Sequence, residues 1–318
     1  MSTTPVANDT STGLADYLRL ARLDHWIKNI FVLPGIAVGM AMAGAPTPGL
    51  VWRILLGVLS TCLASSANYV INEWLDRDFD RHHPLKRARP AVTRNIRGVF
   101  VAVEYALLAC LSLALALAVS AEFMAIAAAL LAMGLIYNVS PVRTKDRVYL
   151  DVLSESVNNP LRFLLGWFIV VSGGLPPSSV LLAYWMGGAF LMAIKRFSEY
   201  RSIGSPELAQ QYRQSFRYYS ESKLLISAFF YAICAAFFLA IFLIKYRIEL
   251  LVSFPFLSLL FAWYLSIGLR PASAAQAPEK LYEERLFLAY VAFLAILVGA
   301  LLVVDMPWLE ILLRPLSY

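Results

Sequence analysis

Charged residues are scarce in this sequence. Only 15% of the 318 residues are Asp, Glu, Lys or Arg, whereas 60% are hydrophobic and the mean hydropathy is +0.66. A soluble domain of this length would need more polar side chains to cover its surface. The composition therefore excludes a soluble globular protein and predicts one that crosses a membrane several times.

Cysteine and histidine are also rare, with three of each. Cys62, Cys110 and Cys234 lie in apolar runs without the spacing of metal ligands, so we expect them to behave as small hydrophobic residues. His82 and His83 are neighbours and cannot share one helix face, which argues against a histidine ligand pair. We expect no nucleic-acid partner.

Apolar runs near the roughly 20 residues that cross a bilayer dominate the chain. They cover residues 29–44, 51–72, 98–120, 122–138, 149–172, 178–195, 222–244, 249–268 and 286–305. The expected fold class is therefore all-α, a polytopic membrane bundle of about nine transmembrane helices.

The ends of the chain are expected to differ from this bundle. Residues 1–13 lack the basic start and apolar core of a secretory signal, so the first run should persist as a helix. We expect an N-terminal arm over residues 1–24, a transmembrane domain over 25–305 and a short interfacial tail over 306–318.

Lys and Arg are distributed unevenly between the loops. Twenty-two of the 27 lie in the arm and in four loops, over residues 19–28, 76–97, 143–147, 195–223 and 270–285. Because basic loops stay cytoplasmic, we expect these segments and the N-terminus on the cytoplasmic side of an inner membrane and the C-terminus outside. The net charge of +6 then faces lipid headgroups and phosphorylated substrates.

An acidic motif follows the second apolar run. Asn72, Asp76 and Asp80 recur at i, i+4 and i+8, so they share one helix face. Hard oxygen ligands in that arrangement suit Mg²⁺ holding a diphosphate. The alternative is a solvated helix end. The cations that follow favour the metal and diphosphate.

Three further segments carry chemistry. Lys86, Arg87 and Arg89 follow the acidic motif and could neutralise phosphate oxygens, although a positive-inside loop looks the same. After the fourth run, Tyr137 and Lys145 lead into a helix that carries a polar stripe. The stripe contains Asp151, Glu155, Asn158 and Arg162.

We interpret that stripe as the wall of a wet cavity, because polar groups inside a membrane helix are otherwise costly. The alternative is an internal ion pair between Glu155 and Arg162.

The third segment contains Lys195, Arg196 and Glu199, where cations outnumber acids and phosphate fits better than a second metal. A loop attracted to lipid remains its alternative.

Taken together, these segments resemble the UbiA superfamily of intramembrane transferases over nearly the whole chain. The resemblance rests on the motif of Asn72, Asp76 and Asp80, the loop at 137–145 and the number of spans. It implies Mg²⁺-dependent binding of an isoprenoid or sugar diphosphate at the cytoplasmic mouth of a helical bundle. A fragment then passes to an acceptor.

Within the superfamily, the chain departs from the usual second Asp-rich motif, because Lys195-Arg196-x-x-Glu199 stands there. Together with the runs at 26–29 and 83–90, and with Arg162 eleven residues after Asp151, this is similar to the branch that includes decaprenyl-phosphate phosphoribosyltransferase. Glu73 stands where the family usually has Asp.

The resemblance implies transfer of a phosphoribosyl group from phosphoribosyl diphosphate to a polyprenyl phosphate. Asn72, Asp76 and Asp80 would be the metal ligands, with Asp151 and Lys145 also catalytic. The substrate-binding set would be Lys28, Asn72, Lys86, Arg87, Arg89, Tyr137, Glu155, Arg162, Lys195, Arg196 and Glu199. One alternative is transfer of a polyprenyl group from polyprenyl diphosphate to an aromatic or other small acceptor. Another is a transporter, which the clustering of acids at one membrane face disfavours.

Overall fold

The computed structural model describes residues 12–43, 49–83, 86–271, 273–276 and 278–312, and every regular element there is a helix. The α-helices are α1 (Leu14–Leu20), α2 (Leu33–Ala43), α3 (Leu50–Asp80), α4 (Pro90–Thr93), α5 (Gly98–Val119), α6 (Ala121–Asn138), α7 (Leu150–Ser156), α8 (Asn158–Val170), α9 (Ser178–Ile203), α10 (Pro206–Tyr212), α11 (Glu221–Tyr246), α12 (Phe254–Gly268), α13 (Arg285–Leu301) and α14 (Pro307–Leu312). The 3₁₀-helices are η1 (Leu23–Val32), η2 (Lys86–Ala88), η3 (Thr144–Asp146), η4 (Gln214–Arg217), η5 (Ile248–Ser253), η6 (Ala274–Gln276) and η7 (Pro278–Glu283).

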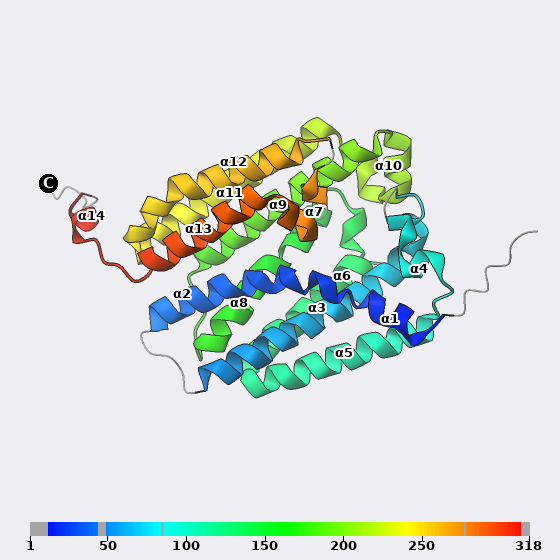
Figure 1. Cartoon of the computed structure of the whole chain (residues 1–318), viewed down its shortest axis with the longest axis horizontal. Coiled ribbons are helices and arrows are strands. Elements are labelled where there is room, and N and C mark those ends of the chain that lie inside the picture. The colour runs from blue at the N-terminus through cyan, green and yellow to red at the C-terminus, as the bar shows by residue number, and fades with distance from the viewer. Residues whose placement is uncertain (1–11, 44–48, 84–85, 272, 277, 313–318) are drawn as a thin grey trace, which may run out of the picture.

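The long helices run side by side, with α4 and α10 at one end of the bundle and α14 at the opposite end (Figure 1). Seven described stretches are long and apolar enough to cross a membrane. They are Leu14–Ala43, Leu50–Asp80, Gly98–Val119, Ala121–Asn138, Ser178–Ile203, Glu221–Tyr246 and Ile248–Gly268. The apolar helix Arg285–Leu301 is shorter. The all-α membrane bundle is thus confirmed, but the count of nine spans is not.

The expected span over 149–172 is where the count first departs. It is divided at Val157 into α7 and α8. Pro160 explains the division, because proline has no N–H to donate to the carbonyl of residue 156 and its ring crowds that turn. The polar stripe therefore lies on two helices rather than on one straight face.

Close packing of α2 against α8 fixes the centre of the bundle. A Cβ atom on Gly35 would lie 2.0 Å from the Phe163 carbonyl oxygen, and one on Gly166 would lie 2.0 Å from that of Val32. Glycine at both positions lets the two backbones touch, as small residues do between membrane helices. The largest hydrophobic cluster surrounds this contact and includes residues 163–165 and 167–170.

The first helix is packed onto the acidic helix. Leu20 is fully buried in a cluster with Val70 of α3, and Arg22 forms an ion pair of 3.2 Å with Glu73. The expected boundary at residue 24 and the interfacial tail stay predictions, and residues 1–11 and 313–318 lie outside the described part.

Candidate active site

The predicted face of α3 is engaged by cations from the loop after α6. Lys145, on η3, donates to Asp76 Oδ1, to Asn72 Oδ1 at 3.2 Å and to Asn138 Oδ1 at 2.7 Å. Arg143 donates to Asp76 Oδ1 at 3.0 Å. Burial lowers the pKa of Lys145 to about 8, although Asp76 opposes that shift. Three oxygens thus converge on one ammonium group.

This arrangement bears on a magnesium site. Within the described ranges, no three His, Cys, Asp or Glu side chains gather as a ready-made metal site. Mg²⁺ commonly takes one or two protein carboxylates and completes its shell with water and substrate phosphates. The oxygens of Asn72 and Asp76 already point at a shared cation, so they fit an ion that arrives with a diphosphate.

Asp80 and the loop after α3 form the neighbouring part of the site. Asp80 is buried and accepts from Arg89. Lys86 donates to Tyr212 and, at 2.9 Å, to Glu199 of α9. These contacts bring the loop after α3 to α9 and α10. Arg87, the remaining predicted cation of this loop, is exposed.

His83 is a buried histidine in the same region. Its Nδ1 accepts from the backbone N–H of Lys86 at 3.2 Å, and its ring meets Tyr212 edge-on at 4.5 Å. Burial and the nearby Lys86 charge lower the pKa of His83 to about 4. His83 is therefore neutral at ordinary pH and positions the loop rather than supplying a charge.

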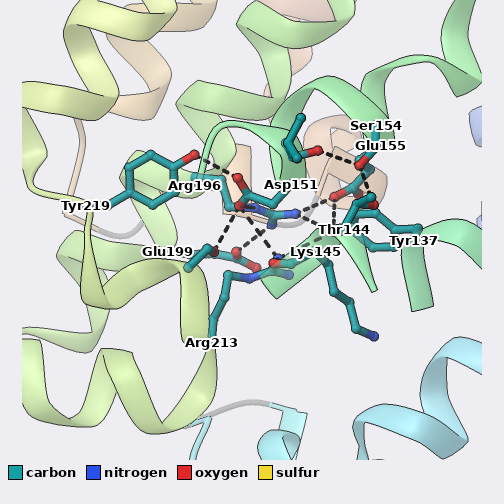
Figure 2. A network of polar contacts seen from close by, with 12 residues as sticks. Tyr137, Thr144, Lys145, Asp151, Ser154, Glu155, Arg196, Glu199, Arg213 and Tyr219 are labelled. Carbon is teal, nitrogen blue, oxygen red and sulfur yellow. Dashed lines mark hydrogen bonds and ion pairs between the residues drawn. The ribbon is translucent and has the colours of Figure 1, made fainter. Parts of the chain in front are cut away.

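Arg196 is the centre of a second charge network (Figure 2). Its guanidinium is 1% exposed and contacts Glu155, Glu199 at 2.9 Å and Asp151 at 3.5 Å. A buried arginine stays charged, so acids beside it are needed to offset the cost of burying that charge, and Figure 2 shows these carboxylates around it. The structure thus joins α7 and α9 through one buried cation.

Asp151 lies behind this arginine. It is fully buried and accepts from Tyr219 at 2.7 Å and from Ser215 at 3.1 Å, while Arg213 lies 3.8 Å away. Both oxygens are therefore engaged by the chain itself. This placement fits a residue that orients Arg196, and direct contact of Asp151 with substrate stays a prediction.

Lys195 and Glu155 keep more access. Their side chains are 17% and 24% exposed and lie 3.9 Å apart, and Tyr137 donates to Glu155 at 2.7 Å. The alternative ion pair between Glu155 and Arg162 is wrong. Glu155 pairs with Arg196, whereas Arg162 donates to Asn29 at 3.0 Å. The two ends of the predicted stripe, on α7 and on α8, thus contact different neighbours.

Lys28 lies on η1, with Nζ 3.0 Å from His25 Nδ1 and 5.9 Å from the Tyr69 ring centre.

The structure also adds residues that sequence reasoning did not select. They are Asn138, Arg143, Tyr212, Arg213 and Tyr219. Their common signal is a polar or aromatic side chain in a basic loop, which is weak because every such loop contains several.

Comparison with known proteins extends this description. The model of the UbiA prenyltransferase family matches residues 32–290. The nodulation protein NoeC of Azorhizobium caulinodans is 31% identical over 197 residues, which are 60% of this chain and 61% of that protein. Decaprenyl-phosphate phosphoribosyltransferase of Mycolicibacterium smegmatis is 29% identical over 199 residues, 61% of this chain and 60% of that enzyme.

A 4-hydroxybenzoate octaprenyltransferase of Cupriavidus necator is 37% identical over 123 residues, 37% of this chain and 42% of that enzyme. The chain thus matches less than two thirds of the length of each of these relatives. A UbiA homolog from Archaeoglobus fulgidus, solved with GPP and Mg²⁺, superposes with a TM-score of 0.69 at 24% identity. The alignment covers 91% of this chain and all of that one, and it bears on the fold.

Proposed function

Because the chain belongs to the UbiA prenyltransferase family, we propose that it is a Mg²⁺-dependent intramembrane transferase of phosphoribosyl groups. The donor would be phosphoribosyl diphosphate, the acceptor a polyprenyl phosphate and the leaving group diphosphate. We place the site at the cytoplasmic face of an inner membrane, with the C-terminus outside.

One observation carries the choice of donor. Lys195 and Arg196 stand with Glu199 in the network on α9, and Lys86 joins it from the loop after α3. Carboxylates alone would collect a second divalent ion, whereas these cations suit phosphate oxygens. Phosphoribosyl diphosphate carries phosphate at both ends of the sugar, so it needs cations beyond those at the diphosphate.

The residues would divide the work as follows. Asn72 and Asp76 would hold Mg²⁺ on the diphosphate, with Asp80 one turn away, and the metal would neutralise the leaving group. Lys145 and Arg143 would shift from Asp76 to diphosphate oxygens. Preorganised cations of this kind stabilise the charge that develops on the departing group.

The second group of cations would act on the other substrate atoms. Lys86 and Lys195 would hold the sugar's remaining phosphate, while Arg196 and Asp151 keep α7 and α9 in place. The acceptor is already an anion, so its oxygen needs orientation at the ribose C1 atom more than it needs a base. The C–O bond to diphosphate breaks as the bond to the acceptor oxygen forms.

A second candidate keeps the fold and the metal but changes both substrates. A polyprenyl group would pass from polyprenyl diphosphate to an aromatic or other small acceptor. The similarity to 4-hydroxybenzoate octaprenyltransferase, 37% identical over its matched stretch, favours this reading.

The two candidates are separated by supplying purified protein with one labelled donor at a time. We expect radiolabel from phosphoribosyl diphosphate to enter polyprenyl phosphate, to stop with EDTA and to return with excess Mg²⁺. Label entering an aromatic acceptor from a prenyl diphosphate, with none from the ribosyl donor, would favour the second candidate. Activity that persists in chelator would remove the metal from both.

A further inference from the structure

Arg162 is an arginine inside the helical bundle whose hydrogen-bond partners are all neutral. It lies on α8 and is half-buried, and among the residues that the structure describes no carboxylate lies within ion-pair distance of it. Glu155 is the nearest acid along the stripe, but Lys195 and Arg196 already hold it. A charge inside a membrane protein without a counter-ion points to a binding function.

The contacts of Arg162 fix its position without using all its donors. Nε donates to Asn29 Oδ1 at 3.0 Å, while Nη1 lies 3.4 Å from the Asn158 carbonyl and Nη2 3.5 Å from Ser65 Oγ. The two Nη contacts are at the long limit of a hydrogen bond. A guanidinium has five N–H groups, so its outer edge retains capacity for an anion.

The partners of Arg162 are themselves held in place. Asn29 Nδ2 donates to Cys62 Sγ at 3.2 Å, and Ser65 Oγ donates to Asn29 Oδ1 at 3.0 Å. Asn29 is 6% exposed and Ser65 is 3% exposed. The amide oxygen of Asn29 is therefore committed to Arg162, and the guanidinium is held from one side by a rigid, neutral support.

The surroundings of the guanidinium are aromatic. Tyr69 and Tyr184 lie close enough to Arg162 to interact with its charge, as does Glu155 more weakly, and Lys28 lies over the ring of Tyr69 at 5.9 Å. Lys195 is close enough to Lys28 for their charges to interact. An anion entering here would meet Arg162, and the rings of Tyr69 and Tyr184 would pack against the apolar chain that follows it.

The neighbourhood of the group distinguishes it from the proposed donor site. Arg162 stands on α8 between Leu161 and Phe163, which both pack in the largest hydrophobic cluster. The cations that surround Asp76 and Asp80 come from the basic loops instead. An anion at Arg162 would therefore lie beside the apolar interior of the bundle, as the phosphate at the end of a lipid chain would.

We propose that Arg162, supported by Asn29 and Ser65, binds the phosphate headgroup of the polyprenyl phosphate acceptor. The identity of that lipid rests on the proposed function, but the site itself is a site for a lipid phosphate. Its position would place the acceptor oxygen between the membrane interior and the donor held by α3. The fork of Arg162 would accept two phosphate oxygens.

The test measures binding of farnesyl phosphate and of farnesol to the purified full-length protein in detergent by calorimetry. Arg162→Gln is expected to weaken farnesyl phosphate binding about 10- to 100-fold, as loss of a charge-assisted pair does, and to leave farnesol unchanged. Arg162→Lys, which keeps the charge without the fork, should fall between. Binding of phosphoribosyl diphosphate with Mg²⁺ should not change.

Arg53→Gln is the matched control. Arg53 is another arginine inside the bundle, on α3, and it donates to the carbonyls of Phe168 and Ile169 at the far end of α8. Its loss should leave farnesyl phosphate affinity at the wild-type value. Wild-type affinity in Arg162→Gln would overturn the assignment.

Two further outcomes are kept apart. If Arg162→Gln does not fold, the wild-type protein is photolabelled with a farnesyl phosphate that carries a diazirine in its first isoprene unit. The label is expected in residues 23–33 or 61–69, and labelling confined to other segments would overturn the proposed site. Failure of ribosyl transfer in the wild-type protein would overturn the proposed function alone, because lipid-phosphate binding is measured without a donor.

Discussion

Replacing Asp76 by asparagine separates the proposed catalytic role of this carboxylate from its structural role. Asp76→Asn keeps the shape of the side chain but removes the charge that Lys145 and Arg143 share. Arg143 retains Asp146 at 2.8 Å and the Asn138 carbonyl at 3.0 Å. Lys145, which is 4% exposed, retains only the neutral oxygens of Asn72 and Asn138.

The magnitudes of the two effects differ in origin. Loss of one preorganised group at a developing charge costs about 10²- to 10³-fold in turnover. Loss of a carboxylate from a buried pair costs up to about 3–5 kcal/mol when the other charge is stranded. Because two oxygens still solvate Lys145, we expect a stability loss nearer about 2 kcal/mol, the scale of one charge-assisted hydrogen bond.

The double variant Asp76→Asn with Lys145→Met separates the loss of turnover from the loss of stability. It removes the stranded ammonium, so the melting temperature in detergent should return toward the wild-type value, whereas transfer of label should stay absent. Transfer at the wild-type rate in Asp76→Asn would refute the metal site. A melting temperature that Lys145→Met fails to raise would refute the charge pairing as the source of the instability.

Two other predictions test the scaffold. Gly166→Ala should lower the melting temperature by several degrees, because its Cβ would lie 2.0 Å from the Val32 carbonyl oxygen. Gly299→Ala, where no atom lies within 4 Å of the added Cβ, should leave the melting temperature unchanged. Equal melting temperatures of the two variants would contradict the close contact of α2 and α8. The pKa of His83 is about 4 in the folded protein and about 6.5 in the unfolded chain, so the unfolded chain binds a proton first as the pH falls. The contribution of His83 to stability is therefore complete above about pH 6.5 and is lost as the pH falls toward 4. The loss is about 1.4 kcal/mol per pH unit within that window. His83→Gln should therefore make the melting temperature depend less on pH between pH 7 and 5, and an unchanged pH dependence would contradict this assignment.

Periodicity along single helices was predictable from the sequence. The i, i+4 spacing of Asn72, Asp76 and Asp80 requires a common face whenever the segment is helical, and α3 extends to Asp80. Apolar length likewise predicted the membrane bundle. These features depend only on neighbours within a few turns of the chain.

The partners of those residues were not predictable in the same way. Asp76 meets Lys145 across 69 positions, and Lys86 meets Glu199 across 113. Such pairs depend on which loops the bundle brings together, and each basic loop contains several equivalent cations. The interruption of the helix near Pro160 is a different case, because its cause is visible in the sequence. The predicted polar face assumed one continuous helix, whereas the proline divides that segment into α7 and α8.

The contact between Arg22 and Glu73 has a practical consequence for handling this protein. Glu73 is 2% exposed and directly follows Asn72, and its ion-pair partner Arg22 lies near the start of the first membrane-length stretch, Leu14–Ala43. A shortened chain that begins after residue 24 would leave the buried Glu73 carboxylate without this partner. Truncation and tag placement at the front of the protein therefore act on the packing around α3 as well as on yield.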